Sequence, residues 1–133
     1  MAMTITYEGS GLIRTIVAAW TSDSNGDASG TTRRISGRLI KGRTNPDAAA
    51  PTDNYDITLT DSQDSYDLLT KCQDNLADRD TANNEEVYFL ILDDAGTPLA
   101  QSLHPVVDDA ITITIANAGD TKGGVLRLYY EAA

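Results

Sequence analysis

The sequence predicts a mainly β protein: a single-domain antiparallel β-sandwich or jelly roll over residues 1–133, with one short α-helix at about residues 64–78. Residues 111–115 alternate isoleucine with threonine, and this period of two is typical of a half-buried strand. Short segments of similar character recur along the chain with turn residues between them, as in sandwiches and jelly rolls. With 133 residues, the chain can bury one core without disulfides or metal.

The N-terminal third predicts three strands. Residues 3–7 alternate apolar and polar side chains and stop at a Gly-Ser-Gly break. Residues 12–20 form a longer apolar stretch, and residues 22–30 are a loop rich in Ser, Asp and Gly. Extended structure resumes over residues 31–43, so we expect the second and third strands to pair as a hairpin.

The single predicted helix follows a loop at residues 44–53 and a cleanly alternating strand at residues 54–60. It covers residues 64–78, because apolar side chains recur there on one side at helical spacing and an aspartate can cap the first turn. The apolar residues are Leu69, Cys72 and Leu76, and the candidate caps are Asp61 and Asp64.

The C-terminal third predicts the remaining strands. Residues 86–92 are apolar on both faces and therefore indicate a central strand. Residues 99–107 suit a weaker strand, which Pro105 restricts to an edge or an end. Residues 110–130 predict a closing hairpin, because two strand-like segments flank an Asn-Ala-Gly-Asp turn.

The charges are unevenly distributed. The formal net charge is −10, which argues against nucleic acid as a direct partner. Residues 1–44 carry six basic and three acidic side chains, whereas residues 45–133 carry four basic and seventeen acidic ones. This polarity suits a protein that docks one face onto a partner, and it also suits a merely solvated acidic face.

No arrangement in the sequence is typical of catalysis. The single histidine, His104, precedes Pro105, and no Gly-x-Ser-x-Gly elbow surrounds a serine. Cys72 is the only cysteine, so it can form neither an intrachain disulfide nor a thiolate metal cluster, and we expect a small buried thiol. We therefore expect a non-enzymatic protein with no catalytic, cofactor-binding or metal-binding residues.

Eight aspartates between residues 53 and 80 could in principle supply oxygen ligands to calcium. No segment matches the Asp-x-Asp-x-Asp-Gly loop with its distal glutamate, and a helix N-terminus accommodates negative charge, so we expect structural roles. A calcium- or carbohydrate-binding β-sandwich module stays an alternative, although one tryptophan offers little to a sugar. The aspartates are Asp53, Asp56, Asp61, Asp64, Asp67, Asp74, Asp78 and Asp80.

A group of glycines and a cluster of basic residues are the remaining candidates for a binding site. Gly119, Gly123 and Gly124 flank a turn between strands and open no helix, so they predict no phosphate cradle. The basic cluster lacks an interleaved aromatic platform, which argues against a groove for single-stranded nucleic acid. It is either a solvated sheet face or a patch that pairs with acidic groups on a neighbouring subunit. Its members are Arg33, Arg34, Arg38, Lys41 and Arg43.

No segment suggests a membrane protein or a secreted one. The first residues lack the basic region and apolar core of a signal peptide. No apolar run approaches the ~20 residues that a membrane-spanning helix needs. We therefore expect synthesis in the cytoplasm and no membrane partner.

Short phrases distributed over nearly the whole chain resemble small structural proteins of tailed bacteriophages. They lie at residues 16–23, 44–46, 50–61, 78–83 and 117–130. The resemblance implies a virion component that is made in the host cytoplasm. With this size, β-rich pattern and acidic surface, it is most similar to a head decoration or cement protein.

The resemblance also implies what such a protein binds. A decoration protein binds the outer capsid shell and stabilises contacts between major capsid subunits, and it associates with itself as a homodimer or homotrimer. Residues 1–8 and the loops at residues 22–30 and 44–53 are expected to contact neighbours, because strand addition and docking occur at edges and long loops. A tail or baseplate component of the phage is the leading alternative.

Overall fold

Seven antiparallel strands form the regular structure of the computed structural model, which describes residues 2–81, 83–93, 95–97 and 103–133. The strands are β1 (Ala2–Glu8), β2 (Ile13–Thr21), β3 (Ala28–Pro46), β4 (Asp56–Asp61), β5 (Glu85–Tyr88), β6 (Val106–Ala116) and β7 (Gly123–Ala132). The described part of the chain contains no helix, and therefore none that could cross a bilayer.

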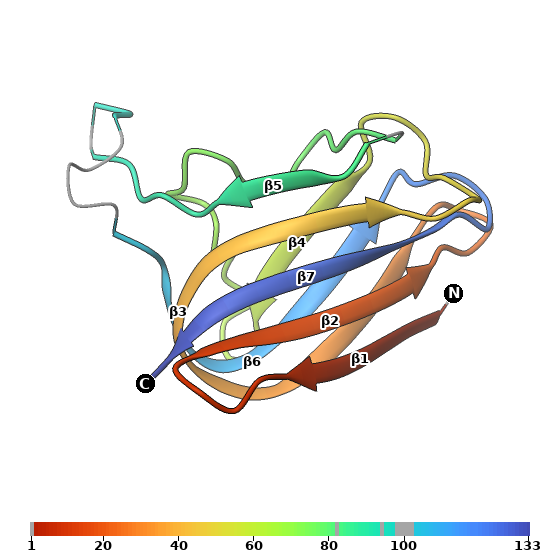
Figure 1. Cartoon of the computed structure of the whole chain (residues 1–133). Coiled ribbons are helices and arrows are strands. Elements are labelled where there is room, and N and C mark those ends of the chain that lie inside the picture. The colour runs from red at the N-terminus through yellow and green to blue at the C-terminus, as the bar shows by residue number, and fades with distance from the viewer. Residues whose placement is uncertain (1, 82, 94, 98–102) are drawn as a thin grey trace.

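One long strand, β3, connects the two halves of the sheet. The strand order is β1-β2-β7-β3-β6-β4, and β5 pairs with β3 beside this path. Residues 28–38 of β3 pair with β6, whereas residues 37–46 pair with β7. Gly37 and Arg38 pair with both neighbours. Figure 1 shows that β3 bends strongly along its length. Register shifts on either side of this point let β3 bend.

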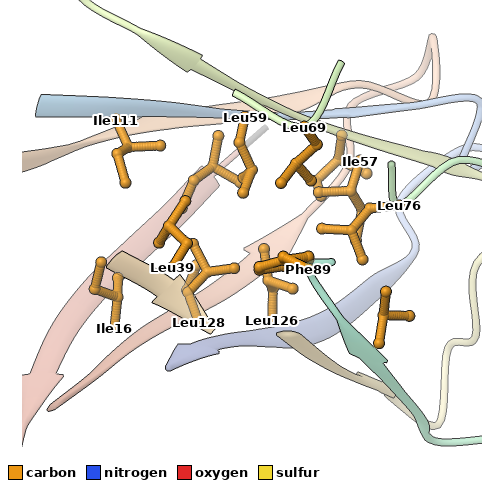
Figure 2. Packing of buried hydrophobic residues seen from close by; sticks show 14 of the residues in the cluster. Ile16, Leu39, Ile57, Leu59, Leu69, Leu76, Phe89, Ile111, Leu126 and Leu128 are labelled. Atoms are coloured by element: carbon orange, nitrogen blue, oxygen red, sulfur yellow. The ribbon is translucent and has the colours of Figure 1, made fainter. Parts of the chain in front are cut away.

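The core lies between these two halves. In Figure 2, side chains from β2, β3 and β7 face side chains from β4 and β6. The inward residues of the Ile–Thr alternation, Ile111, Ile113 and Ile115, are fully buried, which confirms that part of the strand prediction. Burying a side chain of this size contributes roughly 1.5–3 kcal/mol, so this layer dominates the stability. The residues labelled in Figure 2 are Ile16, Leu39, Ile57, Leu59, Leu69, Leu76, Phe89, Ile111, Leu126 and Leu128.

The fold class is confirmed as mainly β and antiparallel. The described strands form one continuous sheet with seven strands, where the sequence predicted about eight in a sandwich. The jelly-roll connectivity stays a prediction.

The helix predicted at residues 64–78 is wrong. This segment forms turns, joined to β4 by the isolated bridge between Asp67 and Thr60. Leu76 has a positive φ of 64°, which an α-helix does not allow. The side chains of Asp67 and Asp74 accept hydrogen bonds from backbone N–H groups two residues ahead and so compete with helical bonding. Leu69, Cys72 and Leu76 are apolar because each is buried in the core beside β4, and not because they share one side of a helix.

Both predicted hairpins are also wrong. β6 and β7 do not pair with each other, because β3 lies between them and pairs with both. The connection at residues 117–122 instead carries the chain from one half of the sheet to the other, and positive φ angles at Asn117, Gly119 and Thr121 make this turn possible. Similarly, β2 pairs with β1 and β7 and not with β3.

The apolar segment at residues 86–92 is not a central strand. Only its start belongs to a strand, the four-residue β5, which pairs with β3 alone. Its apolar character is explained by packing, since Val87 and Phe89 are buried against the core. Of the strand predicted at residues 99–107, the part at 99–102 lies outside the described residues, and β6 begins at Val106.

Candidate functional site

The candidate base, His104, is hydrogen bonded within the fold, and the candidate nucleophile, Cys72, is buried. His104 Nδ1 lies 2.8 Å from the carbonyl oxygen of Phe89, which accepts its hydrogen bond. Burial, with a smaller contribution from Asp67, raises the pKa of the Cys72 thiol to about 11. The thiolate of Cys72 is therefore scarce at neutral pH, which makes it a poor nucleophile.

The aspartates between residues 53 and 80 mostly accept hydrogen bonds from nearby backbone. Asp61 Oδ1 accepts from the N–H groups of Asp64 and Tyr66. Asp74 forms an ion pair with the buried Arg79, with 3.1 Å between Oδ2 and Nη2. No group of three or more potential ligands is placed to hold a metal ion among the described residues. These carboxylates hold the loops beside β4 in place.

The C-terminal glycines serve backbone packing. Gly123 and Gly124 open β7, and a Cβ on Gly124 would lie 3.2 Å from the indole of Trp20. Gly119 has a φ of 86° in the turn before β7. Their role is therefore to allow close approach and a left-handed turn.

The structure separates the five basic residues of the predicted cluster. Arg33 stacks its guanidinium over the ring of Tyr7 at 4.0 Å, beside β1. Arg34 pairs with Asp108 at 3.2 Å in the half of the sheet that holds β6. Lys41 and Arg43 remain together, both on the outer side of β3 between β5 and β7.

Lys41 and Arg43 belong to a surface that we call the tyrosine–basic face. Lys41 Nζ lies 5.4 Å from the ring centroid of Tyr88 and 4.9 Å from that of Tyr129. The Arg43 guanidinium lies 5.5 Å from the Tyr129 centroid. All of these are distances at which a cation is attracted to an aromatic face. The face consists of Lys41, Arg43, Glu86, Tyr88, Arg127 and Tyr129.

Strand register explains why these residues share one side of the sheet. Lys41 is paired with Tyr88 on β5 and with Tyr129 on β7, and Arg43 is paired with Arg127. Paired residues in neighbouring strands point to the same side. The alternate residues of β7, such as Leu128, point into the core instead.

Glu86 is the one carboxylate of the tyrosine–basic face. Its Oε1 accepts hydrogen bonds from Lys41 Nζ and Arg43 Nε, each at 2.8 Å. The bond from Lys41, followed by that from Arg43, lowers the pKa of Glu86, and the same carboxylate raises the pKa of both cations. With three cations and one anion, the face is basic on a strongly acidic chain.

Two of the loops predicted to contact neighbours meet at one end of the molecule. Ser22 Oγ donates to the carbonyl of Gly119 and accepts from the N–H of Lys122. The N–H of Thr52 donates to the carbonyl of Ala118, which joins the second loop to the same turn. This end lies at the right of Figure 1, close to the start of β1. Contact with a partner there stays a prediction.

The opposite end holds an open depression of about 520 Å³. It lies where β3 passes from β6 to β7, and its lining includes Arg38, Val106 and Glu131. Register places these three residues side by side, with Val106 69 % exposed. Arg38 is paired with Glu131, two residues along β7 from the Tyr129 that is paired with Lys41.

Sequence reasoning missed four members of the tyrosine–basic face: Glu86, Tyr88, Arg127 and Tyr129. Their outward alternation with apolar residues is visible in the sequence. Which strands flank β3 is not visible, because pairing depends on the packing of the whole core. The face could therefore be found only after the topology was known.

Comparisons with known proteins return little. No protein-family model and no curated protein matches the chain. Among solved structures, it is similar to a chain described as "Cyanophage Pam1 capsid asymmetric unit", with 12 % sequence identity and a TM-score of 0.47. That match covers 97 % of this chain and 86 % of the other.

Proposed function

We propose that this chain is a non-enzymatic structural protein of a phage virion, and that it acts as a capsid decoration or cement protein. It would bind the outer capsid shell and stabilise contacts between major capsid subunits. The resemblance of its short sequence phrases to tailed-phage structural proteins supports the class. The tyrosine–basic face is the observation that supports a docking role.

The composition of that face is what a protein interface favours. Tyrosine and arginine are enriched at interfaces and among the residues that dominate binding energy. Here Tyr88, 49 % exposed, lies beside Lys41 at the surface of the sheet. The face is basic on a chain of net charge −10, so it favours an acidic partner surface and orients the approach of that surface.

The rest of the molecule suits a cement role. The fully buried core and the hydrogen-bonded loops around Ser22 make a rigid body, which loses little conformational entropy on docking. The strong negative charge keeps free copies soluble before assembly. Many such contacts, each weak, add up to firm binding when the capsid lattice presents them together.

Binding to capsids that lack the protein tests the proposal. We expect the wild-type chain to cosediment with purified capsids, to saturate at an integer ratio to the capsid subunit and to raise the temperature at which the capsids disrupt. The double variant R43Q/R127Q should bind at least tenfold more weakly, since it removes two cations from the face.

The matched control is R33Q/R34Q, which removes two cations from β3 outside the face. It should bind as the wild type does. If both double variants bind equally well, the face is not the docking surface. Binding to purified tails instead of capsids would overturn the decoration role in favour of the tail or baseplate alternative. A large thermal shift of the free protein with calcium would favour the calcium-binding module.

A further inference from the structure

The outer edge of β1 is an uncovered strand margin. β1 pairs with β2 over all seven of its residues, from Ala2 to Glu8. Its backbone forms no hydrogen bond with any other described segment. Figure 1 shows it as the outermost strand, beside β2. Such an edge presents a row of free N–H and C=O groups that another strand can pair with.

The margin at β4 is treated differently. There the chain covers its own edge, because Ile57 donates its N–H to the carbonyl of Leu76, and Leu68 donates to that of Leu59. β1 contains no proline, no lysine and no bulge, which are three of the usual protective devices. The contrast indicates that β1 is kept open.

Side-chain packing holds β1 in a fixed position. Met3, Ile5 and Tyr7 are half-buried against the core, and a Cβ on Gly30 would lie 2.8 Å from Met3 Sδ. The Tyr7 hydroxyl accepts a hydrogen bond of 2.7 Å from the N–H of Arg33. The edge is therefore preorganised, and a pairing strand would also complete the burial of these three side chains.

We propose that a second copy of this chain pairs its β1 with this edge, antiparallel and centred on Ile5. In that register Thr4 of each copy lies opposite Thr6 of the other, and Met3 lies opposite Tyr7. Threonine pairs and aliphatic–aromatic pairs are favourable across strands. A two-fold axis relates the two copies, so both β1 edges are used in the same interface and assembly stops at a dimer.

Charge argues for this orientation. Glu8 is the only charged residue of β1, and in the antiparallel register it lies opposite Ala2 of the other copy. A parallel arrangement would place the two Glu8 carboxylates side by side, which is unfavourable. The inference goes beyond the proposed function, which assigns no surface to self-association, and it stands without capsid binding.

The test measures the mass of the free, purified protein by sedimentation over a wide range of concentration. We expect a dimer for the wild type. The double variant T4K/T6K changes two exposed side chains and sets lysines opposite each other twice, so the dimer should weaken by about tenfold or more.

The control T4K/T6E uses the same positions but sets each lysine opposite a glutamate of the other copy, so it should dimerise as the wild type does. Thermal unfolding of both variants verifies that they fold. A wild-type monomer at every concentration overturns the proposal, as does a dimer that T4K/T6K leaves intact. A monomer whose β1 amides become protected from hydrogen exchange only on capsids would assign the edge to the capsid instead. Failure to bind capsids would leave the dimer measurement unaffected, so the two proposals fail separately.

Discussion

At the scale of single residues, Gly37 determines how the sheet can continue. It is paired with Val107 on β6 and with Ala132 on β7 at once, at the place where β3 passes from one neighbour to the other. A Cβ there would collide with the backbone carbonyl of Glu131. Only glycine leaves room for the two neighbouring strands to approach so closely.

Replacing Gly37 with alanine should therefore destabilise the fold by about 2–3 kcal/mol, since the clash is with backbone and the strands must move apart. The matched control is Gly11→Ala, because a Cβ on Gly11 meets nothing within 4 Å. That change should stay within about 0.5 kcal/mol. Chemical denaturation of both variants measures the difference, and equal stability of the two would contradict this account of Gly37.

At the scale of elements, the loops that connect the strands are held in fixed positions by hydrogen bonds to one another. The turn at residues 117–122 is hydrogen bonded to the loop that follows β2 and to the loop that follows β3. Ser22 is buried and makes two of these bonds through its hydroxyl. The loops at this end behave as a packed layer because their polar groups have partners within the protein.

The variant Ser22→Ala should lower the free energy of unfolding by about 1–3 kcal/mol, because the carbonyl of Gly119 and the N–H of Lys122 lose their partner at a buried site. Ser24, two residues along and exposed, offers a control. Ser24→Ala should be nearly neutral. Urea denaturation provides the comparison, and a neutral Ser22→Ala would mean that water replaces the hydroxyl there.

At the scale of the whole molecule, a strongly acidic chain concentrates three of its few cations on one face. Glu86 links two of them, Lys41 and Arg43, and so joins β5 to β3. Because these bonds lower the pKa of Glu86, its carboxylate stabilises the fold above its ordinary pKa of 4.5. That contribution is lost as the pH falls through the lowered value of the folded state.

The thermal midpoint of Glu86→Gln should therefore lie below that of the wild type at neutral pH, and the gap should close in acid. The control Glu8→Gln removes the same charge from β1, where the side chain is exposed. Its difference from the wild type should be small and should not follow this course. Midpoints recorded across a pH series provide the measurement, and a gap for Glu86→Gln that persists in acid would contradict the role given to the carboxylate.

The sequence by itself determined several of the strands and the buried positions within them. Ile111, Ile113 and Ile115 enter the core as their alternation predicts, and Leu69 and Leu76 are buried although no helix carries them. These properties are local, because period and polarity are set by neighbours along the chain.

Only the tertiary structure decided which strands are neighbours. β6 does not pair with β7 because the long strand β3 lies between them and pairs with both. The tyrosine–basic face and the open edge of β1 follow from that choice, because register alone brings Lys41 beside Tyr129 and leaves β1 at the margin. Strand pairing is a long-range outcome of filling one shared core, and no local pattern encodes it.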